Sequence, residues 1–356
     1  AIGRNFTVNT DATLNHNNRE IIMHGDGEQI IGGSIATFPS IAYFAIDNSS
    51  STHKVIVQKP FTITERIRLI DGILQTDNTN FITLGVSATV DRISSDTENY
   101  VDGPIAKVIN SNTTFTFPVG NSNNYQPITI VTNSGSASTT FKASYSKSPY
   151  SNTTSLGTGL HHVSILEHWI LDRTSGDRGG KVRLSWNLAS DLQGYDGTMC
   201  NLSDLKVCRF NGTQWVNEGG SVISGSCSGS GVLESTNNIT SFSPFTLGST
   251  TTNNPLPVKL TYFKGERDNE KVILSWQTAI EHRNKGFEVE RSYNGTDFER
   301  IGFVAAKGTG QTRQDYSFSL VEPRSAYYRL KQLDIDDKFE YSQTIFIRGN
   351  EEIQET

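Results

Sequence analysis

The stretch HHVSILEHW, residues 161–169, contains three of the chain's seven histidines and one glutamate. Imidazoles and carboxylates are the usual ligands of zinc and the usual general acids and bases. In a regular β-strand, side chains alternate between two faces, and His162 and His168 would lie nearly 20 Å apart, too far to share an ion. We therefore expect the run to be one structural strand of a sheet. One face of this strand would carry His162, Ser164, Leu166 and His168, and the other would carry His161, Val163, Ile165, Glu167 and Trp169.

Three aspartates, Asp334, Asp336 and Asp337, lie in the segment QLDIDDKFE. Alternate carboxylates can converge on a calcium ion. The segment lacks the glycine and the closing glutamate of an EF-hand loop, and aspartate is a common turn residue. A turn is the simpler interpretation, with a Ca²⁺ site as the alternative and no other metal or cofactor expected.

The three cysteines, Cys200, Cys208 and Cys227, lie in one short region at spacings that fit no zinc motif. Outside the cell they would form one disulfide and leave one thiol. Three buried thiols are the other possibility.

No other pattern predicts a catalytic site. The sequence contains no GxSxG nucleophile elbow, and the glycine-rich HGDGEQ and DRGGK segments do not join a strand to a helix as a phosphate-binding loop does. A set of charged residues in the N-terminal third could line an acidic and basic face of the kind that pectate lyases use. Outward, solvated side chains explain the same set more simply; its members are Arg66, Arg68, Asp71, Asp77, Asp91 and Arg92.

The net charge of −6 and the absence of a Lys/Arg run argue against nucleic acid and anionic membrane as partners. No apolar stretch approaches the roughly 18 residues of a membrane span. The 18 Phe, 12 Tyr and 4 Trp are spread along the chain and can build cores. A length of 356 residues suggests two or three domains.

The hydrophobic pattern predicts an all-β protein. In residues 1–98, short apolar segments broken by Asn, Asp or Gly recur about every 20 to 25 residues, which indicates the stacked coils of a parallel β-helix. An ordinary sandwich is the alternative there. Residues 99–249 contain longer alternating segments and the hairpin signal FNGTQW, and we expect an antiparallel sandwich.

A polar, proline-closed linker is expected at residues 250–257. Residues 258–348 contain seven alternating segments, which predict an immunoglobulin-like or fibronectin type III sandwich with Trp276 in its core. The acidic tail, residues 349–356, is expected to begin a tether.

The last two regions resemble modules of secreted and cell-surface proteins of Bacteroidota. The resemblance is carried by LPVKLTYF, LSWQTAIEHRNKGFEVERSYNGTDFERIG and YYRLKQLDIDDKFEYS, and by FTFPVGNSNNYQPITI, HVSILEHWILDR and LSDLKVCRFNGTQW. In that family, the last module commonly precedes a C-terminal sorting domain of the type IX secretion system. The N-terminal repeats are similar to β-rich regions upstream in such proteins.

The resemblance implies export across the cell outer membrane, an extracellular or cell-surface location, and the type IX export and anchoring machinery as partners. It implies no catalytic residues. We therefore expect a non-catalytic adhesin, stalk or filament element that can associate with itself through strand edges or stacked coil ends. The alternative is a carbohydrate-binding or polysaccharide-processing (lyase or hydrolase) surface protein that holds glycans on its β-helix face.

Overall fold

The computed structural model describes residues 1–10, 12–49, 54–92, 99–192, 200–251, 253–254, 260–278, 284–307, 314–334 and 339–349. Within these ranges the fold is all-β, and its one helical element is the 3₁₀ turn η1 (Leu188–Ser190). No helix in the described ranges is long and apolar enough to span a membrane. The chain divides into two compact units, of which the first comprises residues 1–192 and 200–254 and the second includes residues 255–356.

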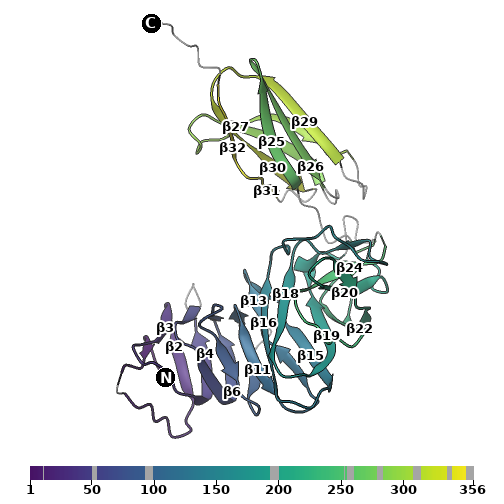
Figure 1. The fold of residues 1–356 in the computed structure, drawn as a ribbon. Helices are drawn as coiled ribbons and strands as arrows, with labels where there is room; N and C mark the ends of the chain where they lie inside the picture. The colour runs from purple at the N-terminus through teal and green to yellow at the C-terminus, as the bar shows by residue number, and fades with distance from the viewer. Residues whose placement is uncertain are drawn as a thin grey trace. The chain divides into compact units, whose positions relative to one another are not determined.

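The first unit begins as a solenoid of two parallel sheets (Figure 1). One sheet follows the order β1 (Phe6–Thr7), β3 (Gln29–Gly32), β5 (Lys54–Val57), β7 (Ile73–Gln75) and β10 (Val101–Asp102). The other follows the order β2 (Ile21–Gly25), β4 (Ile41–Asn48), β6 (Phe61–Asp71), β8 (Ile82–Leu84) and β11 (Ile105–Ile109), with β9 (Thr89–Arg92) also pairing with β6.

The register of these sheets explains the repeat in the sequence. Ile21 pairs with Phe44, and Phe44 pairs with Ile67, so that the chain advances by 23 residues at each of these two steps. Phe44 and Ile67 are fully buried, as are most apolar side chains on the inner side of β4 and β6. One coil cannot bury such a side by itself, and stacking therefore stabilises each coil. The predicted parallel solenoid is confirmed.

The solenoid passes into antiparallel structure without a break in hydrogen bonding. Strand β11 pairs in parallel with β8 on one side and antiparallel with β16 (Thr139–Ser146) on the other. The expected boundary at residue 98 therefore does not coincide with an edge of the sheet, because coil residues 101–109 continue the stack beyond it.

The remainder of the first unit consists of antiparallel strands. The large sheet continues through β18 (His168–Ser175), β24 (Phe245–Ser249), β20 (Leu205–Phe210) and β21 (Trp215–Asn217), with β17 (His162–Val163) also pairing with β24. A five-stranded sheet follows the order β12 (Thr114–Phe117), β15 (Ile128–Ser134), β19 (Gly179–Trp186), β23 (Gly231–Glu234) and β22 (Ser221–Gly225). Strands β13 (Gly120–Asn121) and β14 (Asn124–Tyr125) form a small ribbon.

The second unit contains two antiparallel sheets that share one core. The first sheet has the order β25 (Leu260–Asp268), β26 (Lys271–Thr278) and β29 (Gln314–Val321). The second has the order β28 (Glu299–Ala305), β27 (Asn284–Ser292), β30 (Ala326–Asp334) and β31 (Phe339–Tyr341), with β32 (Ile345–Ile347) also on β30. Trp276 is fully buried at the centre, and its ring lies 5.5 Å from that of Tyr316 and 5.4 Å from that of Phe287.

Candidate functional site

The run 161–169 is not the regular strand that the sequence predicts. It forms two short pieces, β17 and the start of β18, and both pair with β24. Between them the chain bends, and the hydroxyl of Ser164 accepts a hydrogen bond from the amide of Leu166 at 3.2 Å. Serine offers the backbone such a local partner in place of a sheet partner, which accounts for the break. The expected alternation of faces is therefore wrong beyond Val163.

The three imidazoles of the run do not meet at one point. His161 and His162 contact each other through their Nδ1 atoms at 3.1 Å, whereas Nδ1 of His168 lies 2.8 Å from the carbonyl of Ser148. Nε2 of His162 lies 2.6 Å from the carbonyl oxygen of Asn254, to which it donates. Burial lowers the pKa of His162 to about 4, so this imidazole is neutral near pH 7. These contacts are those of structural side chains.

Glu167 is the most unusual acid of the run, because its side chain is fully buried. Its Oε2 accepts hydrogen bonds from the hydroxyl of Tyr145 at 2.8 Å and from Nε2 of Gln126 at 3.1 Å. Gln126 in turn accepts a 3.0 Å hydrogen bond from Ser185 and donates one of 2.9 Å to Ser190. Burial raises the pKa of Glu167. These hydrogen bonds hold one carboxylate oxygen of Glu167 inside the protein.

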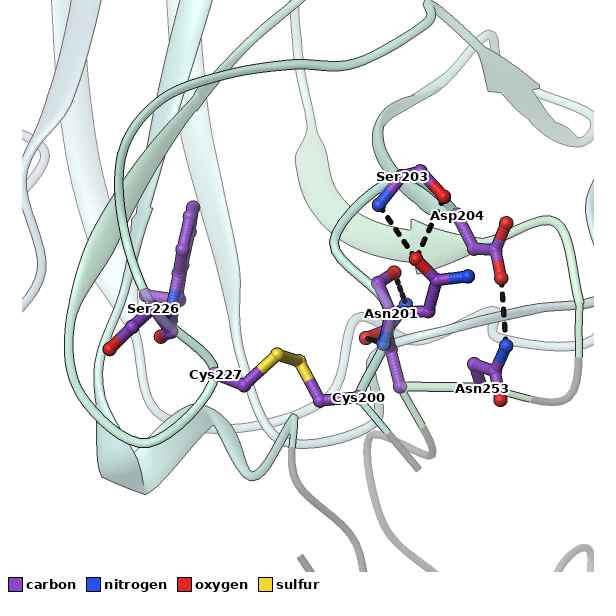
Figure 2. The surroundings of a disulfide bond; sticks show 9 residues. Cys200, Asn201, Ser203, Asp204, Ser226, Cys227 and Asn253 are labelled. Atoms are coloured by element: carbon purple, nitrogen blue, oxygen red, sulfur yellow. Dashed lines mark hydrogen bonds between the residues drawn. A yellow bond between two sulfur atoms is a disulfide. The ribbon is translucent and has the colours of Figure 1, made fainter. Parts of the chain in front are cut away.

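The cysteines form one disulfide, between Cys200 and Cys227, and leave Cys208 as a buried thiol. Figure 2 shows this bond beside a group of polar side chains that joins the segment after Cys200 to the end of the unit. Asn253 donates to Asp204 at 2.8 Å, and Asn254 donates to the carbonyl of Asn201 at 2.8 Å. Burial raises the pKa of the Cys208 thiol, which therefore stays protonated and unreactive.

The calcium candidates lie outside the part of the chain that the structure describes: Asp336 and Asp337 entirely, and Asp334 in its side chain. Among the described residues, no group of three or more His, Cys, Asp and Glu side chains could hold a metal ion.

The charged residues of the solenoid are engaged with one another or with turns. Arg68 forms a 2.6 Å ion pair with Glu20, and Arg66 lies 3.6 Å from both Glu20 and Asp91. Asp77 accepts from the amides of residues 79 and 80 at 2.7 Å, which is a turn contact and lowers its pKa. Arg66, Arg68 and Asp91 are partly exposed, as expected, but their pairing was not visible in the sequence.

Two grooves in the described part of the first unit are open to solvent. One groove has a volume of about 480 Å³. Its lining includes Arg92 and Tyr125, and the guanidinium of Arg92 is stacked 3.9 Å above the Tyr125 ring. The other lining residues include Trp186 and the polar residues Gln126, Ser185, Asn187, Ser224 and Ser230. The sequence places Arg92 among the charged residues that could line one face of the solenoid. Its aromatic partner, Tyr125, lies 33 positions further along the chain, and no local pattern in the sequence connects the two residues.

The other groove, of about 450 Å³, lies beside Lys107. This buried ammonium donates to the carbonyls of Gly85 at 2.6 Å, Val86 at 2.9 Å and Ala88 at 2.7 Å. Burial lowers its pKa to about 8. Lys107 thus caps the turn of the preceding coil, a role that nothing in the sequence around it indicates.

No family model matches the sequence, and no curated protein matches it. Among solved structures, the chain is similar to the crystal structure of a β-1,2-glucanase from Parabacteroides distasonis, with 10% sequence identity and a TM-score of 0.20. The match covers 69% of this chain and 36% of the glucanase chain, so this chain spans little more than a third of that protein's length. A likeness of this strength carries no argument about function.

Proposed function

We propose that the protein is a non-catalytic structural or adhesive element displayed outside the cell, exported by a type IX pathway. The observation that supports it is strand β11, which joins a parallel stack to an antiparallel sheet through backbone hydrogen bonds on both of its sides. Tension applied along the first unit would meet a continuous ladder with no hinge at this point. Such continuity suits a stalk or adhesin.

The finer architecture belongs to the same proposal. The antiparallel part of the first unit would be a β-sandwich, supported by two extended antiparallel sheets with buried side chains on both, among them Trp169 on one and Trp186 on the other. The second unit would be an immunoglobulin-like or fibronectin type III module, supported by a single core that side chains from both of its sheets build.

The polar groups of the 161–169 run support a structural role for that region. Glu167 and His162 are buried and bound to other parts of the protein, which leaves them poorly placed to meet a substrate. A general acid or base needs access to a reacting group at hydrogen-bond distance.

Location and export can be tested in the source organism. Antibody labelling of intact cells should detect the protein on the surface or in the medium, and disruption of type IX export should retain it inside. Retention of the protein in wild-type cells would overturn the proposal.

A glycan-binding role is the second candidate, and the groove beside Arg92 and Tyr125 favours it. The half-buried ring of Tyr125 and several hydroxyl and amide groups suit the apolar faces and hydroxyls of sugars. Glycan-array binding that is lost in a Tyr125→Ala variant, while Tyr293→Ala in the second unit leaves it intact, would support this candidate. Depolymerisation of a glycan would replace the non-catalytic proposal.

A further inference from the structure

The sequence contains two Asn-Gly pairs in nearly the same local context, FNGT at residues 210–213 and YNGT at residues 293–296. An asparagine that precedes glycine can react with its own backbone, because glycine has no Cβ to shield the following amide from the side-chain carbonyl carbon. Since the local sequences match, a difference in reactivity between the two pairs must come from the fold. The two pairs therefore form a matched comparison within one chain.

The first pair lies at the tip of the hairpin between β20 and β21. All residues from Asn211 to Gln214 are exposed, and Phe210 pairs with Trp215 at the base of the loop. The amide N–H of Gly212 makes no hydrogen bond within the described part of the chain, and a Cβ at this position would have nothing within 4 Å. Water and hydroxide can therefore reach this amide directly.

The side-chain carbonyl of Asn211 is surrounded by hydrogen-bond donors. Its Oδ1 accepts from the amide of Thr213 at 3.0 Å, from the hydroxyl of Thr213 at 2.9 Å and from the amide of Gln214 at 2.9 Å. Donors that are already in place stabilise negative charge as it develops on an oxygen during a reaction. These three donors thus polarise the carbonyl and favour attack on its carbon.

Asn294 has a similar set of donors, but its neighbouring amide is occupied. Its Oδ1 accepts from the amides of Thr296 at 3.0 Å and Asp297 at 2.9 Å, and from the hydroxyl of Ser292 at 2.9 Å. The amide N–H of Gly295 donates to the Ser292 hydroxyl at 3.0 Å. Nδ2 of Asn294 donates to the carboxylate of Asp297 at 2.7 Å, which places a negative charge beside the reacting carbon. Both contacts oppose the reaction at Asn294.

We propose that Asn211 is a site of spontaneous covalent modification, at which the backbone nitrogen of Gly212 attacks the Asn211 side chain. Hydroxide removes the proton from this nitrogen, a bond forms from the nitrogen to Cγ of Asn211, and the bond from Cγ to Nδ2 breaks. The departing nitrogen takes a proton from water, which restores the hydroxide, and leaves as ammonia. Water then opens the resulting succinimide at either carbonyl, which gives aspartate or isoaspartate. The reaction needs only water and is independent of the location of the protein.

The two products have different effects on the hairpin. Aspartate keeps the accepting oxygen of Asn211, so the loop retains its hydrogen bonds. Isoaspartate adds one carbon atom to the backbone of the loop, and the pair of Phe210 with Trp215 then loses its register. Trp215 is fully buried in one cluster with the free cysteine Cys208. Isoaspartate should therefore loosen β21 and expose the Cys208 thiol.

Peptide mapping by mass spectrometry, after incubation of the full chain in mildly alkaline buffer, tests the proposal. In the native protein, Asn211 should react at least about ten-fold faster than Asn294, because the hydrogen bond of the Gly295 amide must break first. In urea the two rates should converge, since the local sequences match. A native rate at Asn294 equal to or above that at Asn211, or a difference that persists in urea, would overturn the proposal.

Thr213→Val tests the donors around Oδ1, because it removes the hydroxyl but keeps the branched shape and the backbone amide. The rate at Asn211 should fall about three- to ten-fold, with Asn294 in the same sample as the unchanged reference. A thiol reagent that fails to label Cys208 in the fresh variant shows that the hairpin is intact. An unchanged or higher rate at Asn211 in this intact variant would refute the role of the donors.

The same reagent tests the effect of the products after their chromatographic separation. It should label Cys208 in the isoaspartate form and leave the aspartate form unlabelled. Equal labelling of the two forms would contradict the proposed loosening of β21.

Discussion

The hydroxyl of Tyr145 donates a 2.8 Å hydrogen bond to Oε2 of Glu167, and both side chains lie inside the first unit. Tyr145 comes from β16, whereas Glu167 comes from the bend before β18. The bond thus joins a regular strand to the irregular segment that the histidine-rich run forms. An acid that looks reactive in the sequence is a buried anchor for this bend.

The buried carboxyl makes stability depend on pH in a defined direction. Burial raises the folded-state pKa of Glu167 above its unfolded value near 4.5. The protonated side chain therefore contributes fully to the stability of the fold below pH 4.5, and this contribution is lost as the pH rises. Glu167→Gln should therefore be more stable than the wild type at pH 8, with the difference shrinking towards pH 4.5. Urea unfolding at several pH values measures it. Glu266→Gln, at an exposed carboxylate, should show no such trend; a pH-independent Glu167→Gln difference would contradict the assignment.

His162 makes the stability of the fold depend on pH in the opposite direction, with a loss of stability as the pH falls. Burial lowers the folded-state pKa of His162 from 6.5 to about 4. As the pH falls, His162 therefore takes up a proton in the unfolded chain before it does so in the folded protein, and this favours unfolding. Stability should drop by roughly 3 kcal/mol between pH 6.5 and pH 4 through this residue. His162→Gln should remove most of that drop in urea titrations, while His24→Gln, at an exposed histidine in the solenoid, should retain it. Equal acid sensitivity of wild type and His162→Gln would contradict this role.

The disulfide should contribute substantially to the stability of the first unit. It closes a loop with a sequence separation of 27, for which chain-entropy arguments give about 3–4 kcal/mol. The Cys200→Ser/Cys227→Ser variant should lose that amount in chemical unfolding. Thiol titration provides the check on pairing: no reactive thiol in the native protein, one after unfolding, and three after unfolding with reductant. Three thiols without reductant would show that the bond is absent.

Lys107→Met should destabilise the last coils of the solenoid. The change retains the aliphatic stem but leaves the carbonyls of Gly85, Val86 and Ala88 without their donor. Loss of these buried contacts should cost about 2–4 kcal/mol. Hydrogen exchange should accelerate in residues 85–88 and in their neighbours. Lys147→Met removes an exposed lysine of the same unit and should leave exchange unchanged; unaltered exchange in Lys107→Met would argue against the capping role.

Short-range patterns along the chain were enough to predict the all-β class and the parallel solenoid. Phe61, Ile63, Ile67 and Leu69 occupy alternating positions of β6 and are each at most 4% exposed, because alternation along a strand is a local property. The burial of Trp276 followed from the same kind of pattern.

Tertiary structure alone decided which distant residues meet. The pairing of Cys200 with Cys227, the three carbonyls around Lys107 and the break in the strand after Val163 all depend on segments brought together by folding. Strand β11 likewise belongs to both the solenoid and the antiparallel sheet, because its two edges find partners from opposite directions of the chain. The sequence of a strand indicates which of its two faces can be buried. Which strand pairs with each of its edges depends on the competition among all strands for hydrogen bonds and buried area.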